Sequence, residues 1–274
     1  MPNPSVSVII TTFNRPALLR GAISGVLKQD FAAFELIVVD DCSPGEETGA
    51  IVSSFSDPRI RYMRNMKNEG GTASLNRGLS AAHGAYVAIL DDDDEWSDSQ
   101  KLSKQIAFFE SHPEHVLLGT NILVVHDVSG EELGRSNAPA DDANIRKTFF
   151  KNNPFAHSSI MFRREAALKA HGYEPTLPRG KDYDLCLKLG ALGKMAVLPD
   201  ICVRYREALP VAAKLIEKRL TDARASLKVI KRHRKEYPGF LRSYLGLCAR
   251  IVLFIIFSFF PFIYSALRKI KDRG

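Results

Sequence analysis

Four consecutive carboxylates follow an apolar segment in the first half of the chain. Residues 86–90 form the apolar run, and Asp91 to Asp94 come directly after it. If the run is a buried strand of an open α/β sheet, the acidic residues lie at its carboxyl end, where such sheets bind their ligands. Neighbouring carboxylates repel one another, and a hard divalent cation with oxygen ligands relieves that repulsion. The pattern therefore favours Mn²⁺ or Mg²⁺ bound together with a diphosphate.

An acidic helix N-terminus is the alternative interpretation of the same stretch. Ser97 and Asp98 could cap a helix over residues 99–111, and acidic side chains there would interact favourably with the helix dipole. The two interpretations differ in whether the carboxylates face a ligand site or solvent.

Two other apolar segments also end in polar residues. Residues 7–12 lead into the loop 11–15, and residues 35–39 are followed by Asp40 and Asp41. Apolar strand patterns alternate here with helical ones, which predicts a parallel sheet covered by helices. Because parallel strands end at the same edge of a sheet, the polar residues should line one nucleotide-type crevice.

The spacing of apolar residues predicts the elements that position these side chains. The expected strands lie near 7–12, 35–39, 60–63, 86–90, 116–125, 195–198 and 201–205. The expected helices lie near 16–27, 51–55, 68–82, 99–111, 142–150, 165–170, 183–189 and 211–235.

Charge is distributed unevenly along the 274 residues. The net charge is +7, but residues 208–274 carry 15 Lys and Arg against 4 Asp and Glu, which leaves residues 1–207 at −4. A basic tail on an acidic body suggests an anionic membrane surface or a nucleic acid as partner. The four cysteines lack metal-ligand spacing, so we expect reduced thiols in a cytosolic setting, with no secretory signal before the first strand.

The tail combines a basic amphipathic helix with a long apolar segment. Residues 245–267 are almost wholly apolar, broken by Arg250 and Pro261. They could span a membrane if the Arg250 side chain reaches the interface, but basic flanks on both sides fit a helix that lies in the interface more simply. A buried helix packed on the rest of the chain is the alternative. We expect attachment to the cytoplasmic face of a membrane, and no nucleic-acid partner, because interleaved stacking aromatics are absent from the tail.

Five short motifs together carry a family resemblance. They are Ser7–Arg15, Leu36–Asp41, Asn68–Gly71 with Asn76–Gly78, Leu90–Asp94 and Lys181–Leu185. Each is weak alone, but five in this order resemble the family 2 glycosyltransferases, which are inverting enzymes with the GT-A fold. The resemblance covers about residues 5–206. It implies a Rossmann-like α/β domain over residues 1–207, with a mixed, mainly parallel sheet. The charge and apolar pattern of the tail predicts a membrane-associating helical segment over residues 208–274.

The resemblance implies donor and metal roles for the matched residues. The loop after the first strand would hold the nucleotide base, with Phe13 packing on it, and Asp40 would hydrogen-bond the base, which in relatives favours uracil. Asp92 would contact the ribose and Asp93 the metal. The donor-binding candidates are Thr11, Thr12, Phe13, Asn14, Arg15, Asp40, Asp41, Asn68, Asp91 and Asp92.

Two further candidates belong to the reaction and to the acceptor side. Asp182 matches the family's catalytic base, and inversion needs such a base within hydrogen-bond reach of the acceptor hydroxyl. Its alternative role is a cap for the following helix. His157 stands where relatives also tend to carry histidine beside the acceptor, although a lone histidine next to an apolar strand is often only a hydrogen-bonded core residue.

The sequence also departs from the family pattern. Lys181 replaces the Glu that precedes the catalytic base, Cys186 replaces a Trp, and no His follows Tyr205-Arg206, which leaves a third protein ligand for the metal in doubt. The Gln-x-x-Arg-Trp signature of processive polymerases is absent, which favours transfer of one sugar at a time.

These features lead to one hypothesis and two alternatives. The hypothesis is a membrane-associated, metal-dependent, inverting glycosyltransferase that moves one sugar from a nucleotide-sugar donor, with a UDP-sugar favoured, to a glycan or lipid-linked acceptor in surface-polysaccharide assembly. One alternative is a catalytically silent, membrane-tethered scaffold with the same fold. The other, a nucleotidyltransferase, would need a Gly-rich loop after the first strand, and residues 11–16 contain no glycine.

Overall fold

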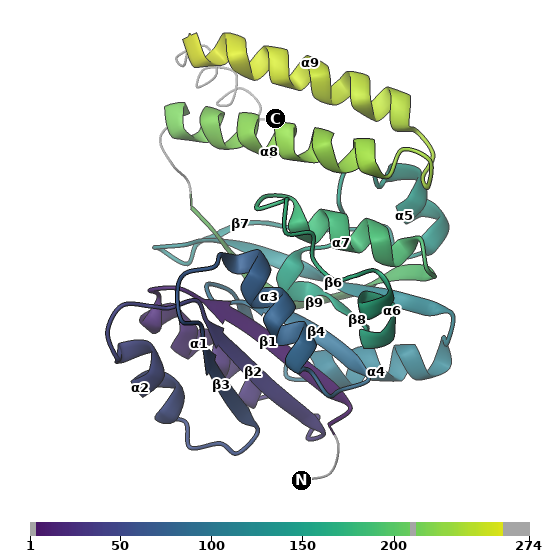
Figure 1. Cartoon of the computed structure of the whole chain (residues 1–274). Coiled ribbons are helices and arrows are strands. Elements are labelled where there is room, and N and C mark those ends of the chain that lie inside the picture. The colour runs from purple at the N-terminus through teal and green to yellow at the C-terminus, as the bar shows by residue number, and fades with distance from the viewer. Residues whose placement is uncertain (1–3, 209–211, 260–274) are drawn as a thin grey trace.

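A single twisted sheet with helices on both faces forms the body of the protein in the computed structural model, which describes residues 4–208 and 212–259 (Figure 1). The strands run in the order β3-β2-β1-β4-β8-β6-β9-β5, and β7 pairs with β6. The strands are β1 (Val6–Thr12), β2 (Phe34–Asp40), β3 (Ile60–Arg64), β4 (Tyr86–Asp91), β5 (Glu95–Trp96), β6 (His115–His126), β7 (Glu132–Arg135), β8 (Met161–Arg163) and β9 (Lys194–Glu207). The helices are α1 (Pro16–Leu27), α2 (Glu47–Ser53), α3 (Gly71–Ala81), α4 (Lys101–Ser111), α5 (Asp142–Thr148), α6 (Arg164–Lys169), α7 (Lys181–Gly190), α8 (Ala212–Arg232) and α9 (Phe240–Phe259), with a 3₁₀ turn η1 at His157–Ser159.

Parallel pairing dominates the first half of the sheet. β1 pairs in parallel with both β2 and β4, and β2 pairs in parallel with β3. β8 joins this half to β6 through antiparallel pairs, after which β6 and β9 run parallel. The expected mixed, mainly parallel sheet is confirmed. Each β-α-β unit buries apolar strands on both faces, which is why β1, β2 and β4 read as near-continuous apolar runs.

Strand register places the polar strand ends side by side. Thr12 is the pairing partner of Asp40 on β2, and Thr11 is the pairing partner of Asp91 on β4. The predicted meeting of these residues at one edge of the sheet is therefore confirmed.

The last part of the sheet differs from the prediction, because the short strands β5, β7 and β8 are not among the expected strands and two expected strands form one. The apolar pattern predicts two strands, at residues 195–198 and 201–205, but both stretches belong to the single strand β9. The register with β6 shifts between Leu198 and Ile201, and Asn121 Nδ2 donates to the carbonyl of Pro199 in this irregularity. Pro199 lacks an N–H, so it interrupts the ladder without ending the strand, because β6 continues alongside.

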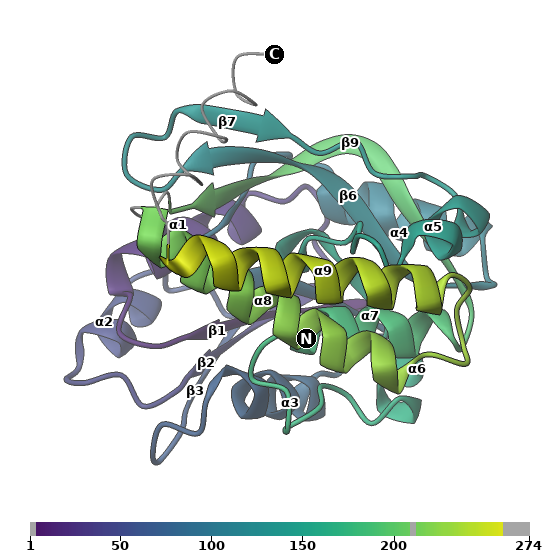
Figure 2. The ribbon, with the colours of Figure 1, turned by 90° about the horizontal axis from the view of Figure 1, so that it is seen from above.

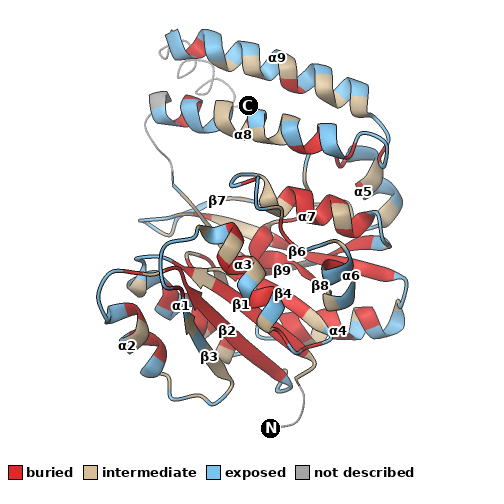
Figure 3. Ribbon diagram, in the orientation of Figure 1, coloured by how far each residue is buried: buried red, intermediate tan, exposed pale blue. Residues whose placement is uncertain are grey.

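Two apolar layers sandwich the sheet (Figure 3). On one face, α1 and α4 cover it with side chains such as Ile23 and Phe109. On the other face, α3, α5, α6 and α7 contribute residues such as Leu75 and Leu185. Buried residues of α8 and α9 join the second cluster, among them Val229. The tail helices thus extend the core of the body.

The tail is an antiparallel pair of helices stacked on α7 (Figures 1 and 2). α8 contacts α7, and α9 lies outside α8. α9 is long and apolar enough to cross a membrane. Only 11% of that stretch is buried within the protein, unlike a core helix, which would be mostly buried. Its exposed large apolar residues are Leu241, Leu245, Val252, Leu253, Ile255, Ile256 and Phe259. The expected amphipathic helix is confirmed as α8, whereas the part of the apolar segment beyond Phe259, including Pro261, lies outside the described residues.

Candidate active site

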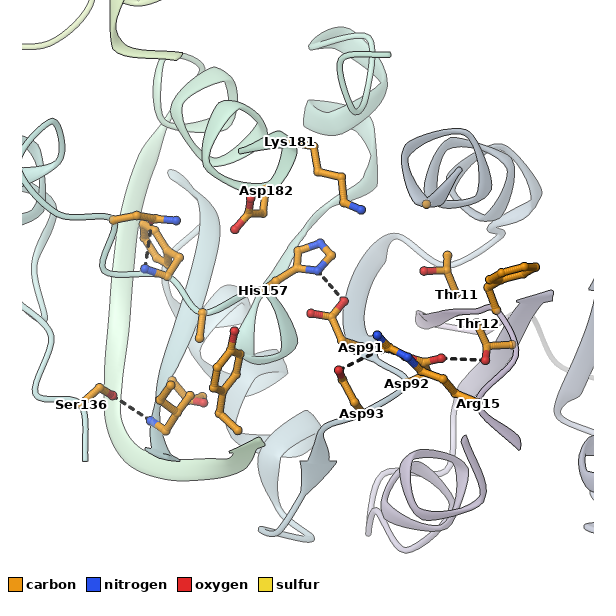
Figure 4. Close-up of a pocket in the computed structure, with 18 of the residues that line it drawn as sticks. Thr11, Thr12, Arg15, Asp91, Asp92, Asp93, Ser136, His157, Lys181 and Asp182 are labelled. Atoms are coloured by element: carbon orange, nitrogen blue, oxygen red, sulfur yellow. Dashed lines mark hydrogen bonds and ion pairs between the residues drawn. The ribbon is translucent and has the colours of Figure 1, made fainter. Parts of the chain in front are cut away.

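A polar cavity of about 750 Å³ opens at the carboxyl ends of β1 and β4 (Figure 4). Its walls come from the loop after β1, the end of β4, the N-termini of α3 and α7, and the segment 153–157. Ten of the predicted site residues line it: Thr11, Thr12, Phe13, Arg15, Asp41, Asp91, Asp92, Asp93, His157 and Asp182. This is the edge at which open α/β sheets bind ligands.

Arg15 closes one side of the aspartate cluster. Its Nη1 lies 3.1 Å from Asp92 Oδ1 and 2.9 Å from Asp93 Oδ2, and Thr12 Oγ1 donates to Asp92 Oδ2 at 2.7 Å. Burial raises the pKa of Asp92 to about 6, although the contacts with Thr12 and Arg15 act in the opposite direction. Burial and the charge of Asp91 raise the pKa of Asp93. The cluster thus concentrates negative charge that any additional cation would stabilise.

Asp94 does not belong to this cavity, although it continues the run of carboxylates. It is buried, and its two oxygens accept hydrogen bonds from Ser158 Oγ at 2.5 Å and from the Arg206 N–H at 2.9 Å. Burial raises its pKa to about 8. Asp94 therefore ties β4 to η1 and β9. The alternative interpretation of the acidic run as the start of a capped helix is wrong. Helix α4 begins at Lys101, its cap residue Gln100 makes no side-chain cap hydrogen bond, and Asp98 accepts from the Gln100 N–H.

His157 is held from both sides of its ring. Nδ1 lies 2.8 Å from Asp91 Oδ1, and Nε2 lies 2.9 Å from Tyr173 Oη (Figure 4 shows the contact with Asp91). Burial lowers the pKa of His157, but the charge of Asp91 outweighs it, so the pKa is raised. Tyr173 is not among the predicted residues, because nothing in its local sequence marks it: it lies beyond α6 and reaches His157 only through packing.

Asp182 and Lys181 begin α7 and face the cavity (Figure 4). Among the described residues, no hydrogen bond or ion pair involves the Asp182 carboxylate, and the helix has no side-chain cap. The alternative role of Asp182 as a cap is therefore wrong. Gly180, with φ of 75°, takes the cap position in a conformation that suits glycine.

Lys181 reaches across the cavity to α3. Its Nζ lies 2.9 Å from the position that a Cβ on Gly71 would occupy, so the ammonium group packs against the N-terminus of α3. Lys181 and Tyr205 both line the cavity but are not among the predicted site residues. The sequence marks Lys181 only as a departure from the family pattern, although a cation beside a predicted base is a signal that could have identified it.

Three predicted donor-binding residues lie outside the cavity lining: Asn14, Asp40 and Asn68. Asp40 is 1% exposed; its Oδ1 accepts from Ser43 and its Oδ2 accepts from Tyr62 Oη at 2.6 Å. It therefore shapes the loop after β2. Its neighbour Asp41 does line the cavity, and its carboxylate accepts from the N–H groups of the loop before α3.

Comparisons with known proteins agree with this architecture. Residues 7–172 match the family model described as Glycosyl transferase family 2. The chain is 30% identical over 205 residues to the amylovoran biosynthesis glycosyltransferase AmsE of Erwinia amylovora, which covers 73% of this chain and 75% of the relative. It is 43% identical over 95 residues to a GalNAc(5)-diNAcBac-PP-undecaprenol beta-1,3-glucosyltransferase of Campylobacter jejuni, covering 34% of this chain and 30% of the relative. Two other curated relatives are matched over 66% of their own length.

A solved structure shows the same fold. The mannosyltransferase of Pyrobaculum calidifontis, in complex with GDP-Man and Mn²⁺, superposes with a TM-score of 0.67 over 96% of this chain and 75% of its own, at 19% identity. With the family match extending over more than half of the sequence, the chain belongs to glycosyltransferase family 2.

Proposed function

We propose that this protein is an inverting, metal-dependent glycosyltransferase that moves one sugar at a time from a nucleotide sugar to a glycan or lipid-linked acceptor. One observation carries the proposal: Asp182, with no partner for its carboxylate among the described residues, faces the same cavity as the aspartates at the end of β4. A displacement that releases an anionic diphosphate requires a base beside the acceptor and positive charge beside the leaving group, and a divalent cation on the aspartates would supply that charge.

Asp182 would act as the base. Its carboxylate takes the proton of the acceptor hydroxyl while the acceptor oxygen bonds to the anomeric carbon of the donor sugar. The bond between that carbon and the diphosphate oxygen breaks on the opposite face, and the electron pair leaves with the nucleoside diphosphate. Lys181, at the N-terminus of the same helix, is placed to contact the negative charge that develops on the diphosphate.

The donor set at the end of β4 suits a hard divalent cation. Asp91, Asp92 and Asp93 offer carboxylate oxygens to the cavity. In the part of the chain that the structure describes, no group of three or more potential metal-ligating side chains is assembled, which fits a cation held by one or two carboxylates and by substrate phosphates. We propose Asp93 as the metal ligand, and Mn²⁺ or Mg²⁺ would supply Lewis-acid neutralisation of the leaving diphosphate.

The donor would lie across the edge formed by β1 and β4. Phe13 is 45% exposed at the rim and is available to stack on a base, while Arg15 and Lys181 offer cations to the phosphates. A UDP-sugar is the favoured donor, on the family resemblance. Because one solved structure with this fold contains GDP-Man, GDP-sugars are the first alternative donors to test against UDP-sugars.

The acceptor and the membrane are proposed together. The name of the C. jejuni relative describes a polyprenyl diphosphate-linked glycan, and AmsE is named for amylovoran biosynthesis, which supports surface-polysaccharide assembly as the pathway class. The outward face of α9 is apolar, and α8 carries many basic residues. We propose that α9 lies in the interface on the cytoplasmic face of the membrane.

Membrane attachment can be tested on the outward face of α9. Val252→Asp with Ile256→Asp should lower co-sedimentation with anionic vesicles, because both side chains are exposed and would lie in the interface. Val128→Asp alters an equally apolar, exposed residue in the β6–β7 turn and serves as the control. Equal vesicle binding by all variants would reject α9 as the anchor.

The reaction can be tested by nucleoside diphosphate release from UDP-, GDP- and dTDP-sugars with Mn²⁺ or Mg²⁺. We expect metal-dependent release with one donor, and its loss in Asp182→Asn and Asp93→Ala. If membrane lipid acceptors are added and neither release nor donor binding occurs with any donor, the catalytically silent scaffold is the correct interpretation. Release without metal would reject the metal-dependent part of the proposal.

A further inference from the structure

A second cavity, of about 370 Å³, lies between the tail and the body. It adjoins the first cavity, since Pro154 lines both. Its lining residues are Pro139, Thr148, Lys151, Asn152, Pro154 and Arg250. The segment 148–157 therefore runs from this second cavity along the wall of the first to His157.

Arg250 is unusual in its position on α9. It follows Leu247 by three residues and precedes Phe257 by seven, so it shares the inward face of the helix with the two buried residues of α9. The outward face carries apolar residues such as Val252 and Ile256. The Arg250 side chain is nevertheless exposed and lines the second cavity, so its charge is accessible to a ligand.

The second cavity is positively charged. Within residues 4–208 and 212–259, Lys151 and Arg250 are its two charged lining residues, and no carboxylate lines it. Among the described residues, neither cation takes part in an ion pair. Thr148 and Asn152 add hydrogen-bonding side chains. The lining thus offers donors and positive charge that suit a phosphate group.

Aromatic packing fixes this cavity to the tail. Phe150, next to Lys151, is buried and packs edge-on against Tyr237 and Phe240, with ring centroids 5.6 Å and 6.3 Å apart. Phe240 is the first residue of α9. The segment that carries Lys151 is therefore docked on the base of the helix that carries Arg250.

We propose that this second cavity binds the phosphate or diphosphate of a lipid-borne acceptor. The proposal rests on the proposed function and names the acceptor class for it. A lipid tail would lie in the interface beside the outward face of α9, its phosphate would meet Arg250 and Lys151, and the attached sugar would extend past Pro154 toward Asp182 and His157. A lipid source is favoured over a free anion because Arg250 belongs to the membrane-facing helix itself.

Vesicle binding by the full chain, measured without donor, tests the site. Phosphatidylcholine vesicles containing a polyprenyl diphosphate are compared with vesicles containing the polyprenol. The variants are Lys151→Gln and Arg250→Gln. Each variant has a matched control nearby in the chain. Lys147→Gln, in the last turn of α5, is the control for Lys151→Gln, and Arg242→Gln on α9 is the control for Arg250→Gln. Both control residues are exposed and do not line the cavity.

We expect Lys151→Gln and Arg250→Gln each to weaken diphosphate-dependent binding about tenfold, the loss that goes with one charge-assisted hydrogen bond. The control variants should bind as the wild type does. Equal losses in all four variants would show non-specific attraction and overturn the proposal, as would equal binding of polyprenol vesicles. Equally tight binding of inorganic diphosphate without vesicles would assign a free anion and overturn the lipid source.

The two proposals can fail separately. Failure of the glycosyltransferase reaction is detected in the wild-type chain by the lack of nucleoside diphosphate release, whereas the binding measurement uses no donor. Normal release with no preference for the polyprenyl diphosphate would overturn only the acceptor site.

Discussion

His233 Nε2 lies 2.9 Å from Asp184 Oδ1, and this contact joins the end of α8 to the helix that carries Asp182. Both side chains are buried, with Lys188 Nζ 2.9 Å from the other oxygen of Asp184 and with Glu236 on His233 Nδ1. The pKa of Asp184 is lowered, because the effect of burial, which would raise it, is smaller than that of His233 and Lys188. The pKa of His233 is raised, because the opposite effect of burial is outweighed by its carboxylate partners Asp184 and Glu236.

The His233–Asp184 pair gives the protein a predictable pH dependence. Because the pKa of His233 is raised in the folded state, its contribution to stability is complete below its unfolded pKa of 6.5 and is lost as the pH rises through the folded value. We expect His233→Gln to lower the free energy of unfolding by about 1–3 kcal/mol at pH 6, and by less at pH 8.5. Urea unfolding across this range measures the difference.

The control for this prediction is His171→Asn, at an exposed position with φ of 59° that asparagine tolerates. Its effect on stability should not change between pH 6 and pH 8.5. A pH-independent loss in His233→Gln would contradict an ionic contact at Asp184.

Asp182→Asn should abolish turnover and leave donor binding intact. The amide keeps the shape of the side chain but cannot take a proton, and removal of a general base costs about 10²- to 10⁴-fold in rate. The measurement is kcat for transfer together with the affinity for the donor. Asp127→Asn, at an exposed turn position, is the control. Retained turnover in Asp182→Asn would contradict the assignment of the base.

His157→Gln should lower the rate of transfer less than Asp182→Asn does, by about 10- to 100-fold. Both ring nitrogens are already engaged, by Asp91 and Tyr173. His157 therefore positions the Asp91 carboxylate and is not free to act as the base. Tyr173→Phe should have a smaller effect, since it removes only the contact at Nε2. If His157→Gln proved as inactive as Asp182→Asn, the histidine itself would be the base.

Arg15→Gln should strengthen Mn²⁺ binding in the absence of nucleotide. The guanidinium now pairs with Asp92 and Asp93, and a cation must compete with it. Because the Arg15 side chain is half exposed, the gain should not exceed about fivefold. Paramagnetic resonance of free Mn²⁺ gives the affinity, and Arg20→Gln on the exposed side of α1 is the control. Weaker Mn²⁺ binding in Arg15→Gln would contradict this competition.

Lys181→Met should raise the KM for the donor by about tenfold and change kcat less, because it removes a cation from the diphosphate side of the cavity. Lys181→Arg should keep most of the affinity. Initial rates at several donor concentrations separate the two constants. An unchanged KM in Lys181→Met would show that the ammonium group lies away from the bound phosphates.

The sequence by itself determined the alternation of strands and helices in the first half of the chain and the edge at which the polar residues gather. Apolar periodicity is local, and parallel strands must end at one edge, so the pattern alone places Thr11 and Asp91 together, as their strand pairing confirms. Family motifs added Asp182 to the same site, and the cavity contains all three residues.

Only the tertiary structure decided which polar side chains face the cavity. Asp93 lines it while Asp94 turns away to Ser158, and Asp40 is taken up by Ser43 and Tyr62. The reason is physical: a buried carboxylate must find hydrogen-bond donors, and these donors come from segments far away in the sequence that packing brings close. Sequence spacing along one segment carries no information about those partners.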